Sequence, residues 1–335
     1  MLHTISEINT FLSNPLPGNV LQSLLNAVEA FGSLKVAYSE GSAALVDELL
    51  LIRELQYIST LSGKDLSYED IIAGISLKKK DNDAYLQATI YRHCERYLQE
   101  ALSLYKIITA TDFFRVNCCL NTNNLLSLSD SGFTDAHESM SAEVNEVVFK
   151  ALYGLNNDHH ILIRFAATYY LLSTLMPTHR FYILALDLLF SLILSNDRLV
   201  PHAPIWLAKY IILDSDWDSD NHKSFENAVL AFIKYLTDEF NHISRMIRRH
   251  KSRSTEIAGI IGGIMPGTYV EKLSRLISSN LYVRNGDIIN VLDVTPMTAI
   301  KYIKALESGM IITGIKLGRD KIYIVKGYSS LIVQE

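Results

Sequence analysis

The sequence predicts a mainly α-helical protein that ends in a small module of three helices and a β-hairpin. Apolar residues recur three and four positions apart through most of the chain, which is the spacing of a buried helix face. Short β-branched runs on either side of a Gly-Arg-Asp turn occur after residue 309, and they predict the hairpin. With 335 residues, 49% of them hydrophobic, the chain has enough apolar side chains for about two domains.

The first 105 residues form the first predicted part, an N-terminal helical segment. Two apolar stripes predict separate helices there, made by Val20, Leu21, Leu24, Leu25 and Val28, and by Leu45, Leu49, Leu50 and Leu55. A further long helix is expected over residues 88–107. The region 116–137 is polar and rich in turn residues, so it is either a β-hairpin or an ordinary surface loop.

Residues 165–194 contain the most informative stretch, two apolar helices joined by a short turn around Pro177. Their apolar positions keep helical spacing on both sides of the turn, so both helices are expected to lie in the core. A membrane span is excluded, because Pro177, Arg180 and Asp187 fall inside the hydrophobic window and charge at mid-bilayer depth is costly.

This stretch, LLSTLMPTHRFYILALDLLFSLIL, resembles the Fic (Fido) family, whose motif here is H-P-F-x-[DE]-G-N-G-R-x-x-R. Pro177 falls on the family's proline and Leu188-Leu189 on its leucine pair. The other motif positions depart from the pattern. The resemblance therefore implies a Fic-like core over residues 106–255 with a degenerate catalytic motif, formed by Met176, Pro177, His179, Arg180, Phe181, Tyr182, Leu184 and Asp187.

The substitutions remove the groups on which the family's phosphoryl-transfer chemistry depends. Met176 replaces the catalytic His and cannot act as a general base. Bulky side chains at Phe181 and Tyr182 replace residues of the glycine-containing loop that approaches the nucleotide phosphates, and Asp187 replaces the final Arg. If the alignment is shifted so that His179 takes the place of the catalytic His, the general base is restored but no other motif residue is. The simpler interpretation of His179 and Arg180 is a solvated polar turn.

Two further segments fit the resemblance. Glu40-Gly41 lies in a setting like the family's inhibitory helix, although these residues also suit an ordinary turn that starts the helix from Ala43. The segment 112–115 resembles the aromatic-Arg stretch that leads into the family's flap. The resemblance implies that a β-hairpin flap at 116–137 could dock a protein partner by strand addition.

The last third of the chain predicts a long helix over 225–251, a Gly-rich linker over 256–269 and a separate module over 270–335. Helices are expected at 270–280, 287–292 and 295–307, the last capped by Thr295 with Pro296 in its first turn. A hairpin of residues 310–317 and 321–325 follows. This order resembles a winged helix-turn-helix. The Gly-rich segment lacks the Gly-Lys-Ser/Thr ending of a phosphate loop.

In the third helix of this module we expect Ala299, Ile300, Ile303 and Leu306 to face the core. The DNA-binding candidates are then the outer residues of that helix and the basic residues of the hairpin, namely Met297, Thr298, Lys301, Lys304, Lys316, Arg319 and Lys321. A winged helix is also used for protein interaction, so that alternative stays open. Dimerisation would strengthen binding to DNA by a weakly basic module.

Composition limits the remaining choices. The net charge of -5 does not by itself imply a polyanionic partner, and the three cysteines have neither metal spacing nor a disulfide framework. The first residues lack a signal-peptide pattern, so a cytoplasmic protein is expected. We predict a catalytically silent Fic-like regulator that binds DNA or a protein and needs no metal or cofactor. The alternative is a divergent Fic-type adenylyltransferase, with ATP and Mg²⁺, that transfers AMP to a protein hydroxyl.

Overall fold

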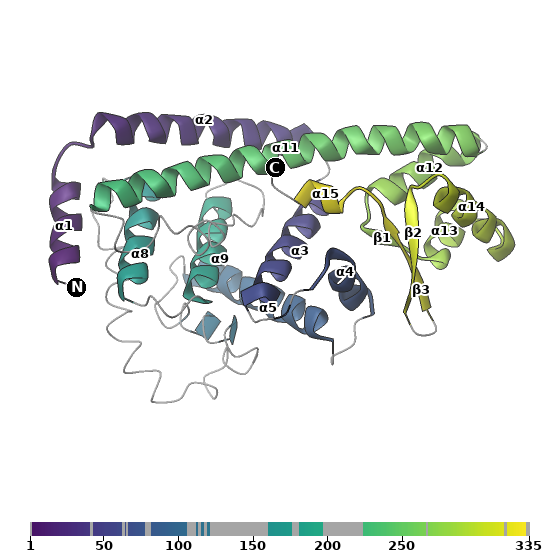
Figure 1. Ribbon diagram of the computed structural model, residues 1–335, viewed down its shortest axis with the longest axis horizontal. Helices are drawn as coiled ribbons and strands as arrows, with labels where there is room; N and C mark the ends of the chain where they lie inside the picture. The colour runs from purple at the N-terminus through teal and green to yellow at the C-terminus, as the bar shows by residue number, and fades with distance from the viewer. Residues whose placement is uncertain are drawn as a thin grey trace. The chain divides into compact units, whose positions relative to one another are not determined.

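The computed structural model describes residues 2–40, 43–61, 64, 66–77, 82–105, 112, 115–116, 119–120, 160–175, 181–196, 224–265, 267–317 and 320–332. These residues are mainly helical, with one small antiparallel sheet near the C-terminus (Figure 1). The prediction of a mainly α fold is therefore confirmed. The hairpin predicted at 116–137 falls almost entirely outside the described residues, of which 116, 119 and 120 are helical.

The N-terminal helices are α1 (Leu2–Ser13), α2 (Gly18–Glu40), α3 (Ala43–Leu61), α4 (Tyr68–Leu77) and α5 (Asp83–Tyr105). The later helices are α8 (Ile161–Leu175), α9 (Phe181–Asn196), α11 (Phe225–Ile264), α12 (Gly267–Ser278), α13 (Asn285–Leu292), α14 (Pro296–Ser308) and α15 (Ser329–Ile332). The strands are β1 (Tyr282–Val283), β2 (Ile312–Leu317) and β3 (Asp320–Val325).

The chain divides into two compact units. Unit 1 comprises residues 1–35 and 89–241, and unit 2 comprises residues 36–88 and 242–335. The helices α3 and α4 therefore group with the C-terminal module rather than with α1. The boundaries between these units follow residues 35, 88 and 241, whereas the sequence predicted boundaries at 105, 255 and 269.

An aromatic cluster joins α8, α9 and α11 in unit 1. The ring centroids of Phe165 and Phe190 lie 4.1 Å apart, and Phe232 of α11 lies 6.0 Å from Phe190 and 5.3 Å from Tyr169. All four side chains are buried. The prediction that α8 and α9 lie in the core is confirmed for the side chains that the structure describes, because these rings fill the space between the three helices.

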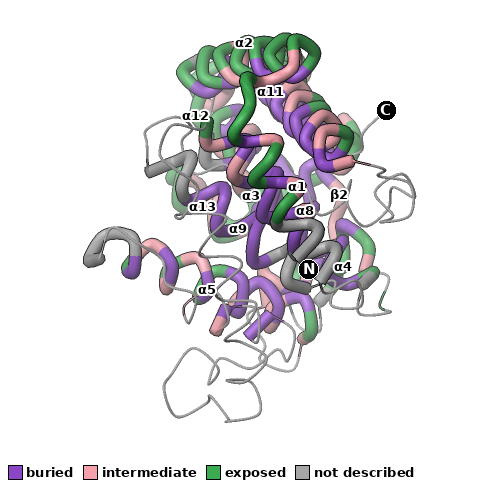
Figure 2. Tube along the Cα trace, turned by 90° about the vertical axis from the view of Figure 1, so that its left-hand side faces the viewer, coloured by how far each residue is buried: buried purple, intermediate pink, exposed green. Residues whose placement is uncertain are grey.

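The helix α2 corrects the first predicted stripe. Val20 and Leu24 are buried, but Leu21, Leu25 and Val28 are 48%, 63% and 51% exposed. Figure 2 shows exposed residues along the outer side of α2. Apolar residues occupy more than one face of this helix, so spacing alone could not separate the buried stripe from the exposed one.

The core of unit 2 contains the second predicted stripe, since Leu45, Leu49, Leu50 and Leu55 of α3 are all buried. The helix α4 was not predicted, although its sequence carries a start signal. Ser67 Oγ accepts a hydrogen bond from Asp70 N at 3.1 Å, and Asp70 Oδ2 accepts one from Ser67 N at 3.1 Å. This reciprocal arrangement is a capping box, in which two unpaired backbone donors at the start of a helix are satisfied together.

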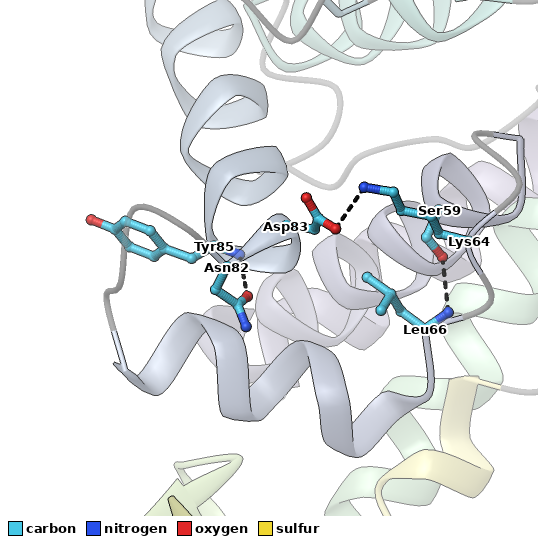
Figure 3. Close-up of polar contacts among 6 residues, drawn as sticks. All are labelled: Ser59, Lys64, Leu66, Asn82, Asp83 and Tyr85. Carbon is cyan, nitrogen blue, oxygen red and sulfur yellow. Dashed lines mark hydrogen bonds and ion pairs between the residues drawn. The ribbon is translucent and has the colours of Figure 1, made fainter. Parts of the chain in front are cut away.

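The start of α5 is fixed against the loop that follows α3. Asn82 caps the helix, and Gly74 of α4 lies so close that a Cβ atom there would clash with Asn82 Oδ1 and lie 2.8 Å from Ala84 Cβ. Three polar contacts hold the region (Figure 3): Lys64 Nζ to Asp83 Oδ2 at 2.6 Å, Leu66 N to Ser59 Oγ at 3.3 Å and Tyr85 N to Asn82 Oδ1 at 3.1 Å.

The C-terminal module follows the order α12, β1, α13, α14, β2 and β3, with sheet order β1-β3-β2. Both strand pairs are antiparallel; Tyr282 pairs with Ile324, and Ile312 pairs with Val325. Besides the predicted hairpin, the sheet therefore contains the two-residue strand β1. The helix α4 packs against β2 and β3, and Arg284 Nη2 donates to Ser76 O at 2.7 Å.

The helix α11 continues well beyond its predicted end at Lys251. Residues 252–264 are helical, so most of the expected linker at 256–269 consists of the end of α11 and the start of α12. Ile257 and Ile261 are buried and extend the apolar stripe, whereas Gly259 and Gly263 face open space, with no heavy atom beyond the adjacent helix backbone within 4 Å of where a Cβ atom would lie. Burial of this stripe outweighs the low helix propensity of glycine.

The side chain of His250 joins α11 to the end of α12. His250 Nε2 donates to Ser278 O at 2.9 Å, and the ring lies 5.5 Å from that of Tyr328. Burial lowers the pKa of His250 from its ordinary value of 6.5, and the hydrogen bond to the Ser278 carbonyl opposes this effect only in part. The neutral imidazole is therefore favoured in the folded state.

We expect the stability of unit 2 to fall as the pH is lowered below about 6.5. The unfolded chain binds a proton at His250 more readily than the folded chain, so the stabilisation is complete above the unfolded-state pKa and decreases towards the lower folded-state pKa. His250→Gln keeps an amide donor for Ser278 O but does not titrate. Denaturant unfolding at several pH values should show a smaller loss in this variant than in the wild type; equal losses would contradict the prediction.

Candidate functional site

The junction of α8 and α9 was the first candidate site. Its turn, including Met176, Pro177, His179 and Arg180, lies outside the described residues. The backbone of α9 is described from Phe181, but the side chains of Phe181, Tyr182 and Leu184 are not. Asp187 is thus the predicted motif residue whose side chain can be placed.

Asp187 lies in the core and contacts α8. It is 3% exposed, and its Oδ1 accepts a hydrogen bond from the hydroxyl of Tyr169, which is 1% exposed. Ser191, one turn later in α9, donates to Asp187 O at 2.8 Å. The sequence offered no signal for Tyr169 as the partner. The arrangement ties two core helices together, and burial keeps the carboxyl group away from solvent.

The other features expected from the family resemblance are described only in part. Gly41 and the side chain of Glu40 lie outside the described residues. In the segment that leads to the expected flap, Tyr97 of α5 donates to Asp112 Oδ1 at 2.7 Å and accepts from Arg115 Nη1 at 3.2 Å. Burial raises the pKa of Tyr97, as does its bond to Asp112. Tyr97 therefore stays a neutral donor and orders Asp112 and Arg115 against α5.

The second candidate site is the face of α14 in unit 2. Its start agrees with the prediction: Thr295 is the N-cap, its hydroxyl accepts from Thr298 N at 3.3 Å, and Pro296 occupies the first turn. This cap satisfies one backbone donor and fixes where the helix begins. It thereby determines which side chains of α14 point away from the module.

The outer face of α14 carries three of the predicted residues. Met297, Lys301 and Lys304 are exposed, and Thr298 is half-buried. Neither lysine has an ion pair with a residue that the structure describes. One core prediction was wrong: Ile300 is 43% exposed.

The residue that replaces Ile300 in the core is Tyr302, which is 9% exposed. Its ring lies 5.8 Å from that of Tyr269 in α12, an aromatic contact that places Tyr302 on the buried face of α14. The sequence pattern assigned only aliphatic residues to the core of this helix, and it therefore did not predict that Tyr302 is buried. The buried stripe of α14 is therefore Ala299, Tyr302, Ile303 and Leu306.

The basic residues predicted on the hairpin differ in how far their charges are engaged by neighbouring side chains. Lys316 is exposed at the end of β2. Lys321 approaches Glu307 Oε1 at 3.4 Å and lies 4.6 Å above the ring of Tyr323, so its charge is partly engaged within the module. Arg319 lies outside the described residues.

The charge of the C-terminal segment differs in sign from that of the whole chain. Residues 270–335 hold nine Lys and Arg against six Asp and Glu, whereas the chain as a whole has a net charge of -5. Positive charge is therefore concentrated in the part of the chain that carries α14. A module with this balance favours an anionic partner over a cationic one.

No protein-family model matches this chain, and no curated protein matches it. Within the described ranges no group of three or more His, Cys, Asp or Glu could hold a metal ion, and none of the helices there has both the length and the apolar character needed to cross a membrane.

Proposed function

We propose that this protein is a regulator that binds duplex DNA through residues 267–332. In this proposal the segment is a winged helix-turn-helix, α14 is the recognition helix and the β2-β3 hairpin is the wing. The observation that carries the proposal is the exposed face of α14, on which Lys301 and Lys304 lie one turn apart without an ion pair to a described residue. Such lysines are available to neutralise backbone phosphates.

For the rest of the chain, we propose a Fic-like helical structure without catalytic activity. The burial of Asp187 against Tyr169 supports this, because a buried carboxyl group at the place of the family's final Arg offers nothing to a nucleotide phosphate. In this view unit 1 has a structural or partner-binding role. ATP and Mg²⁺ are not needed for DNA binding.

The proposal is tested by measuring binding of the full chain to a fluorescent random-sequence duplex over a range of salt concentrations. Fluorescence anisotropy should rise with protein concentration, and the logarithm of the association constant should fall linearly with the logarithm of the salt concentration. If the anisotropy stays flat at low salt and high protein concentration, the proposed function is wrong.

Replacing either lysine of α14 should weaken DNA binding through loss of one phosphate contact. For Lys301→Ala and for Lys304→Ala we expect the salt slope to fall by about 1 and the affinity to fall about fivefold to tenfold near 0.1 M salt. Lys234→Ala is the matched control, since Lys234 is an exposed lysine of α11 in unit 1. Equal losses in all three variants would contradict a specific role for α14.

A further inference from the structure

We propose that α14 reads thymine methyl groups in the major groove through Met297 and Ile300, so that the preferred ligand is A·T-rich duplex DNA. This inference rests on the proposed DNA binding and adds the class of sequence that is bound. It concerns two apolar side chains that phosphate binding leaves without a role.

Met297 and Ile300 are the exposed large apolar residues of α14. They are 79% and 43% exposed, and they lie three positions apart. Lys301 and Lys304 follow Met297 by four and seven positions, so the four residues share one face of α14. An apolar patch beside two exposed lysines matches a ligand that presents both methyl groups and phosphates.

The location of the two apolar residues agrees with base reading. Met297 is the second residue of α14, directly after Pro296. In helix-turn-helix proteins the N-terminal residues of the recognition helix contact base edges. Lys301 and Lys304 lie one and two turns further along, and in this proposal they contact phosphates.

The other side chains of the helix leave few means of reading a base. Every residue of α14 is described, and those that are not buried are Pro296, Met297, Thr298, Ile300, Lys301, Lys304, Ala305, Glu307 and Ser308. None of them is Asn or Gln, which read adenine with paired hydrogen bonds, and none is Arg, which reads guanine. Lysine can also bind guanine, but this proposal assigns Lys301 and Lys304 to backbone phosphates. The thymine C5-methyl group is the apolar feature of the major groove, and apolar side chains contact it.

The test compares binding of the full chain to two duplexes that differ only in methyl groups. One is a 20-base-pair duplex of alternating dA and dT, and the other contains deoxyuridine in place of every thymine. Hydrogen-bonding edges are the same in both. We expect the wild type to bind the thymine duplex more tightly, by about fourfold to about fifteenfold, for one or two buried methyl groups.

Protein variants assign this difference to α14. In Met297→Ala/Ile300→Ala the preference for thymine over deoxyuridine should fall to about one, with the salt slope unchanged because no charge is removed. Met310→Ala is the matched control, since Met310 is 70% exposed but follows the end of α14. That variant should keep the full preference.

The outcomes separate this inference from the function on which it rests. Equal wild-type affinity for the two duplexes, with normal salt dependence, overturns methyl reading and leaves DNA binding in place. A thymine preference that survives in Met297→Ala/Ile300→Ala also overturns it. No salt-dependent binding to either duplex overturns the proposed function and this inference together, and favours a protein partner for the exposed face of α14.

Discussion

Replacing Asp187 by arginine is expected to destabilise unit 1 by about 3–5 kcal/mol. Asp187 is 3% exposed and accepts a hydrogen bond from the hydroxyl of Tyr169, so the variant would bury a positively charged guanidinium group where the structure holds a carboxyl group. The Tyr169 hydroxyl could accept one hydrogen bond from that group, but being neutral it would not compensate the buried charge. An uncompensated buried charge has a cost of this size. Urea unfolding followed by circular dichroism measures the loss, as a lower midpoint at an unchanged slope.

This substitution also tests the relation to the Fic motif, which has an arginine at this position. If position 187 lay in a phosphate-binding site like that of the family, Asp187→Arg would lose little stability. The variant would then also bind ATP more tightly than the wild type, as measured by calorimetry. Asp187→Asn is the control, because an amide oxygen still accepts from Tyr169, and it should cost much less than the arginine. Comparable stability of Asp187→Arg and the wild type would contradict the structural role assigned here to Asp187.

The parts of the fold that the sequence predicted correctly depend on local rules. Apolar spacing located the buried faces of α3, α8 and α9, and capping chemistry located Thr295 at the start of α14. Local rules failed where contact with another helix determines which side chain is buried. Tyr302 is buried because Tyr269 of α12 contacts it, and the sequence gives no sign of that contact.

The candidate site was predictable to a similar degree. Lys301 and Lys304 follow from the helix period once the start of α14 is known, and both are exposed as expected. The environment of Asp187 could not be predicted, since its partner Tyr169 lies 18 residues earlier in another helix. A pattern identifies residue types and faces, but which side chains meet across two helices depends on packing.

Two glycine substitutions are expected to change stability in opposite directions, and Gly74→Ala is the larger. Alanine normally stabilises a helix interior by about 0.5–1 kcal/mol relative to glycine. In α4 this gain is outweighed, because the new Cβ atom would clash with Asn82 Oδ1 and lie 2.8 Å from Ala84 Cβ. The Asn82 side chain cannot move aside without losing its hydrogen bond to Tyr85 N, which caps α5.

Overpacking and a lost cap together give an expected loss of about 2–4 kcal/mol for Gly74→Ala. Gly32→Ala in α2 is the matched control: it makes the same chemical change within a helix, but apart from the adjacent backbone of α2 no heavy atom lies within 4 Å of the added Cβ. Denaturant unfolding should therefore show destabilisation at position 74 and a small stabilisation at position 32. Stabilisation by both would mean that α4 and the start of α5 do not pack as closely as the structure places them.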